Sequence, residues 1–441
     1  MTKIAFVVQR YGAEINGGAE ALCRGLAEKL AARHQVEVLT TTAVNYVTWK
    51  NQLPPGTSVL NGVTVRRFRV NIERKRAFFD RIYDIVANVY RFEVNTGKWR
   101  GTLASVYPYN HESWKRRPKK ILLAAYNCLA RWWLEPVWMW LQGPISRELT
   151  QHLARHHRDF DAIIFISYSY LTSFRNIPLA ADRAMVFPTA HNEPALYLEL
   201  FDEVCGMPRF HFFNTTEERD LYFARFPKAM DRPCSIVGTG IEVTAIADVE
   251  EVDDALITSS PYIIYVGRIE PSKGCDTLFK YFQQYIRESG SDLRLVLVGK
   301  SEMPIPESKQ IQHAGFVSER VKNRLILEAQ CLVMPSPYES LSLVMLEAWA
   351  LKRPVLAFAG CDVLAGQCKR SGGGRVYADY DSFASTLKSL LDSKALTEHL
   401  GESGKAFVDE NYSWETVLYK IESGIETMMS QAQQKTQEQV Q

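Results

Sequence analysis

The amino-acid sequence predicts an α/β protein with two doubly wound parallel-sheet domains, the first of which carries a helical insert. Short apolar runs of strand length alternate with segments of helical apolar spacing, once over residues 1–238 and again over residues 239–410. With 441 residues the chain is too long for one ordinary core, since domains average roughly 150 residues. We therefore expect one sheet in each half, with the two domains facing a central cleft.

The first domain opens with a strand at 4–8, a helix at 19–33 and a second strand at 36–40. Two parallel strands joined through a helix form a βαβ unit with a right-handed crossover, which is the usual start of a parallel sheet. The remaining strands of this Rossmann-like domain are expected at 162–166, 184–187 and 211–213.

The alternation restarts after a polar, acidic stretch at 248–260. The second Rossmann-like domain is expected to contain strands at 262–266, 293–298, 331–334 and 354–358, with helices at 276–287, 318–328 and 343–351. Residues 411–430, with Trp414 near their start, are expected to form a C-terminal helix that crosses back to the first domain. Residues 431–441 are polar and rich in glutamine, which predicts a disordered tail.

An insert at about 78–143 is rich in aromatic and basic side chains, and we expect mostly helices there, including one at 121–141 that breaks near Pro136. Residues 66–131 hold 16 lysines and arginines against 5 acidic residues, a net charge of +11 in a chain whose total is +2. Basic amphipathic segments with tryptophan favour anionic membrane surfaces. The alternative is a helical cap with an incidental charge run.

Composition excludes several classes of protein. Hydrophobic residues make up 46% and charged residues 23%, as in globular proteins, and no run reaches the about 18 apolar residues that a membrane-spanning helix needs. The N-terminus shows no signal-peptide core. The eight cysteines form no C-x-x-C or zinc-like spacing, which fits reduced thiols. We expect a cytoplasmic protein, with the inner face of the cytoplasmic membrane as a further location.

Two glutamates straddle the turn between the expected strand 331–334 and helix 343–351. Glu339 follows the carboxyl end of the strand, where open α/β sheets bind ligands, and Glu347 lies early in the helix. Carboxylates accept hydrogen bonds from sugar hydroxyls, and the helix start offers N–H groups to a phosphate. A nucleotide sugar combines these chemical groups. The alternative is a glutamate that only stabilises the helix dipole.

Two cations, Arg268 and Lys273, lie in the loop 267–274 directly after the strand 262–266. Arginine supplies a planar fork and lysine a point charge, so both can converge on one diphosphate. They would neutralise a leaving group without a metal ion. A basic loop in solvent is the alternative.

Two weaker signals lie in the first domain. Gly17 and Gly18 precede the helix 19–33, where glycine lets a ligand approach the backbone. They are not part of a G-x-G-x-x-G fingerprint, which argues against hydride transfer. His191 follows the strand 184–187, where an imidazole can bind a sugar hydroxyl. The alternative for the two glycines is a simple turn, and the alternative for His191 is a packed or surface histidine.

These four motifs share their order and spacing with a known family. The glutamate pair with its Leu-Glu-Ala continuation, the Gly-Arg-x-x-Pro-x-Lys-Gly loop, the Gly-Gly-Ala-Glu turn and the strand-end histidine resemble the retaining GT-B glycosyltransferases of family four, the group 1 glycosyl transferases. The resemblance covers nearly the whole chain outside the insert. It implies a GT-B fold and a nucleotide-sugar donor.

The resemblance also implies roles for individual residues. Glu347 would bind the ribose hydroxyls, Glu339 the hydroxyls of the donor sugar, and Arg268 and Lys273 the diphosphate. The implied catalytic residues are Glu339, His191, Arg268 and Lys273, and the implied donor-binding residues are Gly17, Gly18, Arg268, Lys273, Ser340, Leu341, Ser342, Leu343 and Glu347. The segment Thr215–Glu218 resembles one that faces the cleft in this family.

One departure from the family pattern concerns Ser340 and Ser342, where many relatives have glycine. Serine keeps the backbone N–H but approaches a phosphate less closely. The two Asp-x-Asp sequences, 159–161 and 379–381, are interpreted as a strand entry and a helix cap rather than metal sites. We expect no metal ion and no cofactor besides the donor.

The predicted function is retaining transfer of a hexose from a UDP- or GDP-sugar to a glycan or lipid-linked acceptor in polysaccharide or glycolipid biosynthesis. The alternatives are a GT-B sugar-nucleotide epimerase, a phosphorylase, and a non-catalytic protein that binds sugar nucleotide or nucleic acid. We expect contact with anionic membrane through residues 66–131 and no nucleic-acid partner.

Overall fold

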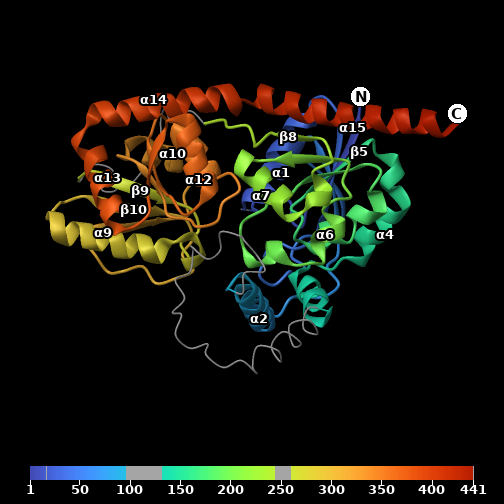
Figure 1. Ribbon diagram of the computed structural model, residues 1–441, viewed down its shortest axis with the longest axis horizontal. Helices are drawn as coiled ribbons and strands as arrows, with labels where there is room; N and C mark the ends of the chain where they lie inside the picture. Colours follow the sequence, from blue (N-terminus) through green and yellow to red (C-terminus); the bar gives the residue numbers. More distant parts are fainter. Residues whose placement is uncertain (16, 96–131, 244–259, 441) are drawn as a thin grey trace. The chain divides into compact units, whose positions relative to one another are not determined.

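The computed structural model describes residues 1–15, 17–95, 132–243 and 260–440. It divides into two compact units (Figure 1). Unit 1 comprises Met1–Thr239 together with Leu418–Gln441, and unit 2 comprises Gly240–Val417. The chain passes from unit 1 to unit 2 one residue beyond the predicted boundary at 238.

Within the described residues, unit 1 is built on an eight-stranded sheet in the order β3-β4-β2-β1-β5-β6-β7-β8. Neighbouring strands are parallel except β3 and β4. The central strands β1 (Lys3–Val7) and β5 (Ala162–Ile166) are almost entirely apolar and buried, as expected of a sheet covered on both faces. The other strands are β2 (Gln35–Thr41), β3 (Gly56–Leu60), β4 (Val63–Phe68), β6 (Ala184–Phe187), β7 (Phe210–Phe213) and β8 (Cys234–Ile236). The helices outside the insert include α1 (Gly18–Leu30), α4 (Arg147–His156), α5 (Leu171–Phe174), α6 (Phe201–Val204) and α7 (Thr216–Arg225).

The start of the basic segment 66–131 lies in the hairpin β3–β4, which the sequence analysis did not predict. Arg66 Nε donates to Glu37 Oε1 at 2.6 Å, and Arg67 Nη1 donates to Ser58 Oγ at 2.8 Å. These two cations of the expected membrane-binding surface are therefore bound to side chains of the sheet itself.

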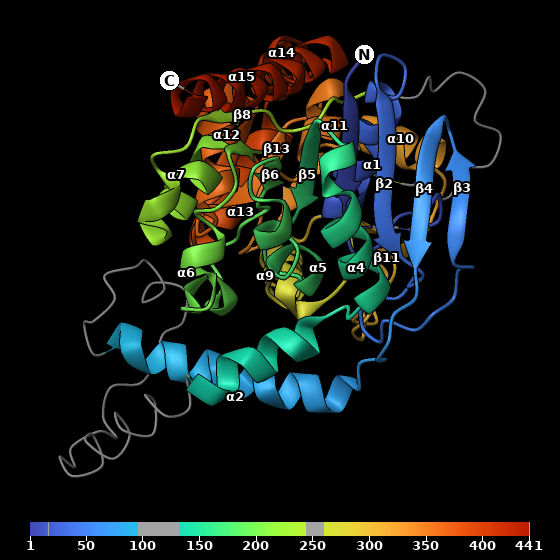
Figure 2. The same cartoon turned by 90° about the vertical axis from the view of Figure 1, so that its right-hand side faces the viewer.

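Two described helices represent the insert: α2 (Arg76–Asn95) and a helix at 132–142, which lie side by side in both views (Figure 1, Figure 2). The second helix continues through Pro136, so the predicted break there is wrong. Tertiary contacts hold it on both sides of the proline, because Trp138 is buried in the core and the Glu135 carboxylate accepts from Leu200 N at 2.8 Å. Residues 96–131, which carry much of the predicted basic surface, lie outside the described residues.

Within its described part, unit 2 has a fully parallel six-stranded sheet in the order β11-β10-β9-β12-β13-β14. Alternate residues of β9 join different apolar clusters, so helices cover both faces of the sheet. The strands are β9 (Tyr262–Val266), β10 (Arg294–Val298), β11 (Ile311–Gly315), β12 (Leu332–Met334), β13 (Val355–Phe358) and β14 (Gly374–Tyr377). The helices include α9 (Cys275–Ser289), α10 (Glu319–Glu328), α11 (Leu343–Ala350), α12 (Asp362–Ser371), α13 (Tyr380–Asp392) and α14 (Lys394–Asn411). The predicted fold class of two doubly wound parallel-sheet units is confirmed.

The C-terminal helix α15 (Trp414–Val440) begins in unit 2 and belongs to unit 1 from Leu418 onward. Trp414 packs directly on Gly240, where a Cβ atom would lie 2.2 Å from the indole. The helix also runs through residues 431–440, which were expected to be disordered. That stretch contains no glycine or proline, and its glutamine, lysine and glutamate residues are good helix formers, so the helix propagates.

Candidate active site

The predicted donor-binding residues of the second half of the chain lie where the sheet of unit 2 changes its winding direction. β9 has β10 on one side and β12 on the other. Ligands of open parallel sheets bind beyond the carboxyl ends of the strands at such a switch point. Loop 267–274 follows β9 and loop 335–342 follows β12, which places both loops at this edge of the sheet.

Lys273 and Glu339, one from each of these loops, form an ion pair. The distance from Lys273 Nζ to Glu339 Oε1 is 2.8 Å, and the side chains are 26% and 14% exposed. Gly274 permits this approach, because its φ is +73° and a Cβ atom there would lie 2.3 Å from the Pro335 carbonyl oxygen. The structure thus brings together two predicted motifs, while the role of each residue stays a prediction.

Glu347 on α11 is bound to Lys322 on α10, a residue that the sequence analysis missed. Lys322 Nζ lies 2.8 Å from Glu347 Oε2 and 2.6 Å from Glu319 Oε2. Burial raises the pKa of Glu347 above its ordinary value, and Lys322 opposes that rise. Burial lowers the pKa of Lys322, but Glu347 and Glu319 together raise it above its ordinary value. The signal in the sequence that could have identified Lys322 is its position, one turn after Ser318, the N-cap residue of an expected helix.

The start of α11 is shaped by Ser342, whose φ of +66° places a residue with a side chain in the left-handed region. Its side chain does not cap the helix; the hydroxyl faces Met334 Sδ at 3.9 Å. The buried amide of Gln367 on α12 donates to the carbonyl oxygen of Leu341 and so holds this turn from behind. Gln367 is a second positioning residue that the sequence analysis did not identify.

Arg268 forms a local ion pair in its own loop. Its Nη1 lies 3.2 Å from Glu270 Oε1, and its side chain is 47% exposed. The Tyr265 hydroxyl donates to the Arg268 carbonyl oxygen at 2.7 Å, which fixes the backbone at the end of β9. The convergence of Arg268 and Lys273 on one ligand stays a prediction.

Gly17 and Gly18 lie at the corresponding position of unit 1, where β1 has β2 and β5 on either side. A Cβ atom at Gly17 would lie 2.1 Å from Glu20 Oε2, whereas no atom would lie within 4 Å of one at Gly18. Glu20 is buried and accepts from Arg10 Nε at 2.9 Å and from Gln9 Nε2 at 3.0 Å. Gly17 therefore makes room for a buried ion pair, and the backbone at Gly18 stays open to a ligand.

His191 follows β6, and in the described part of the chain its buried Nδ1 atom has no hydrogen-bond partner. Glu218 on α7 braces this loop, because its two carboxylate oxygens accept from Ala190 N and Asn214 N, each at 2.7 Å. Burial raises the pKa of Glu218 to about 8, against the lowering effect of these N–H donors. Glu218 is completely buried, so the expectation that the whole segment Thr215–Glu218 faces a cleft is wrong for this residue.

The two Asp-x-Asp sequences have structural partners. Asp161 Oδ2 accepts from Lys3 N at 2.8 Å, and Asp159 lies 3.0 Å from His156 Nδ1. Asp379 caps α13 in a capping box, which confirms the prediction of a helix cap. Across residues 1–15, 17–95, 132–243 and 260–440, no group of three or more His, Cys, Asp or Glu side chains is arranged to hold a metal ion.

Comparison with known proteins finds a family match over the part of the chain that holds the site of unit 2. Residues 250–407 match the family model of the glycosyl transferases group 1. These residues are therefore similar to a group 1 glycosyl transferase domain, and we call them the group 1 domain. This domain holds every predicted site residue of unit 2 together with Lys322, whereas Gly17, Gly18 and His191 lie outside it.

Among curated proteins, the chain is similar to the D-inositol 3-phosphate glycosyltransferase of Rhodococcus opacus. The two are 29% identical over 224 residues, which are 46% of this chain and 49% of the relative. The chain spans between a third and a half of the length of the curated relatives it matches, with 33% to 51% of each covered.

Solved structures resemble the chain over nearly its whole length, and two of them serve as examples. Sucrose-phosphate synthase from Thermosynechococcus elongatus superposes with a TM-score of 0.63 at 15% identity and covers 98% of this chain and 100% of its own. HepE from Anabaena, in complex with UDP-glucose, gives 0.63 at 13% identity, with coverages of 97% and 100%. At this identity the likeness shows the fold alone, and that fold is GT-B.

Proposed function

We propose that the chain is a retaining glycosyltransferase that moves a hexose from a UDP- or GDP-sugar to a glycan or lipid-linked acceptor without a bound metal ion. The observation that carries this proposal is the contact of Lys273 with Glu339 at the switch point of unit 2, beside the helix that bears Glu347. The group 1 domain and the UDP-glucose bound to HepE support a nucleotide-sugar donor.

The two glutamates would hold the two sugar rings of the donor. An ionised carboxylate has two oxygens with about four lone-pair sites, so Glu339 can keep Lys273 while it accepts from sugar hydroxyls. Glu347 would accept from the ribose hydroxyls, while Lys322 orients this carboxylate and opposes the rise in its pKa that burial causes. Each glutamate is thus held by its own lysine before the donor arrives.

The diphosphate would lie against Lys273, Arg268 and the first N–H groups of α11. Groups that face the place where negative charge develops stabilise the transition state without reorganising, and this is usually the largest catalytic contribution. In the ligand-free pair Glu339 offsets the charge of Lys273, so a bound diphosphate would supply that lysine with a second anion. We assign no nucleophile or general base and propose attack from the same face as the departing phosphate.

The test uses the full chain and a panel of nucleotide sugars. The cognate donor should raise the melting temperature, because it binds the folded state only. NMR of the product should show a retained anomeric configuration, and turnover should persist in EDTA. Lys273→Ala and Glu339→Ala should each lose about 100-fold or more in turnover.

Lys280→Ala is the matched control, since Lys280 is an exposed lysine on α9 and lies outside both loops of the site. Its turnover should stay within a few-fold of wild type. If Lys273→Ala and Glu339→Ala behave like this control, the assigned site is wrong. Release of an epimerised free sugar from donor alone would instead indicate an epimerase, and donor binding without turnover would indicate a binding protein.

A further inference from the structure

The helix at 132–142 has a second apolar face that is exposed. Leu134, Trp138 and Leu141 are buried, as an amphipathic helix requires. Trp133 and Trp140, two turns apart on another face, are 73% and 47% exposed. Tryptophan contributes a large apolar area, and exposed patches of such side chains mark interaction sites.

This orientation is fixed by a buried anchor. The carboxylate of Glu135 is 5% exposed and accepts from Glu199 N at 3.2 Å and from Leu200 N at 2.8 Å. Rolling the helix to bury Trp133 would break both bonds and leave a carboxylate in an apolar core, which is costly. The outward position of the two tryptophans is therefore a property of the fold.

A cavity of about 560 Å³ opens beside this face. Its apolar wall includes Ile72, Met139, Trp140 and Phe174, and two arginines, Arg147 and Arg175, line it as well. Trp140 thus belongs both to the exposed aromatic face and to the cavity. An apolar cavity next to cations fits an amphiphile whose head is anionic.

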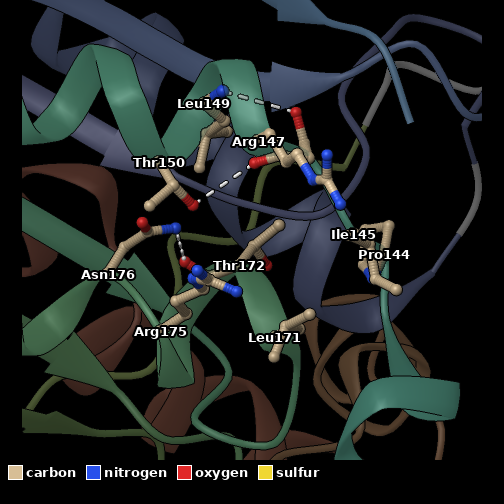
Figure 3. Close-up of a pocket in the computed structure, with 10 residues that line it drawn as sticks. Pro144, Ile145, Arg147, Leu149, Thr150, Leu171, Thr172, Arg175 and Asn176 are labelled. Carbon is tan, nitrogen blue, oxygen red and sulfur yellow. Dashed lines mark hydrogen bonds between the residues drawn. The ribbon is translucent and has the colours of Figure 1, made fainter. Parts of the chain in front are cut away.

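The two arginines also line a smaller recess, in which Leu171 is a further lining residue (Figure 3). Arg147 begins α4, and its backbone N–H is held by Asn71 Oδ1 at 2.7 Å. Both side chains are exposed, and among the described residues neither guanidinium has a hydrogen-bond or ion-pair partner. No described Asp or Glu lines the cavity or the recess, so the charge of the two arginines is not offset there.

We propose that this face of unit 1 docks on an anionic membrane, with the phosphate of a phospholipid between Arg147 and Arg175, its first methylene groups in the cavity, and Trp133 and Trp140 at the interface. The guanidinium fork matches phosphate oxygens, and tryptophan favours the boundary between headgroups and acyl chains. The surface is distinct from the group 1 domain, so the inference stands independently of the proposed donor chemistry.

The test measures sedimentation of the full chain with lipid vesicles at low salt. Binding is expected to vesicles that contain phosphatidylglycerol and to be much weaker with phosphatidylcholine alone, and it should fall as salt rises. The double variant R147A/R175A should bind about 30-fold more weakly, the loss expected for two cations at an anionic surface. Trp133→Ala with Trp140→Ala should also weaken binding.

The matched control is R155A/R158A, which removes the same charge from exposed residues at the far end of α4 and just beyond it. It should keep nearly wild-type vesicle binding, and nucleotide-sugar turnover without vesicles should be unchanged in R147A/R175A. Equal losses in both double variants would overturn the site in favour of a general charge effect. Absent vesicle binding would overturn it too, as would binding of mixed-sequence RNA, lost in R147A/R175A, in place of vesicles.

Discussion

The close contact between the two donor-site loops can be tested by adding a single methyl group at Gly274. Gly274 and Gly290 flank α9 and have similar left-handed φ values of +73° and +63°. A Cβ atom at Gly274 would lie 2.3 Å from the Pro335 carbonyl oxygen, whereas one at Gly290 would meet no atom within 4 Å. Gly290→Ala is therefore a control that shares the backbone strain of Gly274→Ala but lacks its collision.

The expected cost of each variant follows from these contacts. An alanine in the left-handed region costs about 1–2 kcal/mol at either position, offset by about 0.4–1 kcal/mol because the unfolded chain loses freedom. Only Gly274→Ala also forces the backbone of Pro335 to shift, which costs about 1–3 kcal/mol. The difference between the two variants in free energy of unfolding should thus be about 1–3 kcal/mol.

The assay combines urea unfolding with binding of the nucleoside diphosphate that most stabilises the wild type. Gly274→Ala should separate Lys273 from Glu339 and weaken nucleotide binding about tenfold or more, since misplacement by about 1 Å is costly at a preorganised site. Gly290→Ala should bind like the wild type. Equal stabilities and equal affinities in the two variants would refute the argument that these loops depend on their close contact.

Three further predictions concern residues that hold the candidate loops of each unit in place. Lys322→Met removes the cation that opposes the raised pKa of Glu347, so that pKa should rise further, and nucleotide binding should weaken about tenfold near neutral pH and recover at higher pH. Ser342→Gly relieves a φ of +66° and should stabilise the fold by up to about 1 kcal/mol in urea unfolding. Glu218 should make stability fall as pH rises from about 4.5 to about 8, because over that range the unfolded carboxyl ionises while the folded one, with a pKa of about 8, stays protonated.

Each of these predictions has its own contrary outcome. Unaltered pH dependence of binding in Lys322→Met would show that Glu347 does not rely on this cation. For Ser342, the comparison is Ser342→Ala, which keeps the strained backbone and should gain nothing; equal stabilities of the two variants would contradict the argument. For Glu218, Glu218→Gln should reduce the loss of stability between pH 5 and pH 8, whereas Glu217→Gln should retain it, and identical slopes would contradict the buried-carboxyl assignment.

The sequence alone determined the central strands and the edge at which the site lies. The expected strands at 162–166, 184–187 and 262–266 match the structure residue for residue. Parallel strands buried on both faces are continuous apolar runs with clear ends, so they can be recognised without a structure. Loops that follow such strands share one edge of the sheet, which is why Lys273 and Glu339 could be assigned to one site.

The tertiary structure alone decided what surrounds those residues. Lys322 and Gln367 come from helices that pack beside the candidate site of unit 2, and Glu218 comes from a helix beside the His191 loop of unit 1. In each unit the order of strands in the sheet decides which helices those are. The edge hairpin β3–β4 escaped prediction because a partly exposed edge strand has no continuous apolar run. Likewise, a run of glutamine and lysine shows no apolar period, although its residues favour helix. Charge pairing and backbone strain depend on distances in the fold, and such distances are not local properties of the sequence.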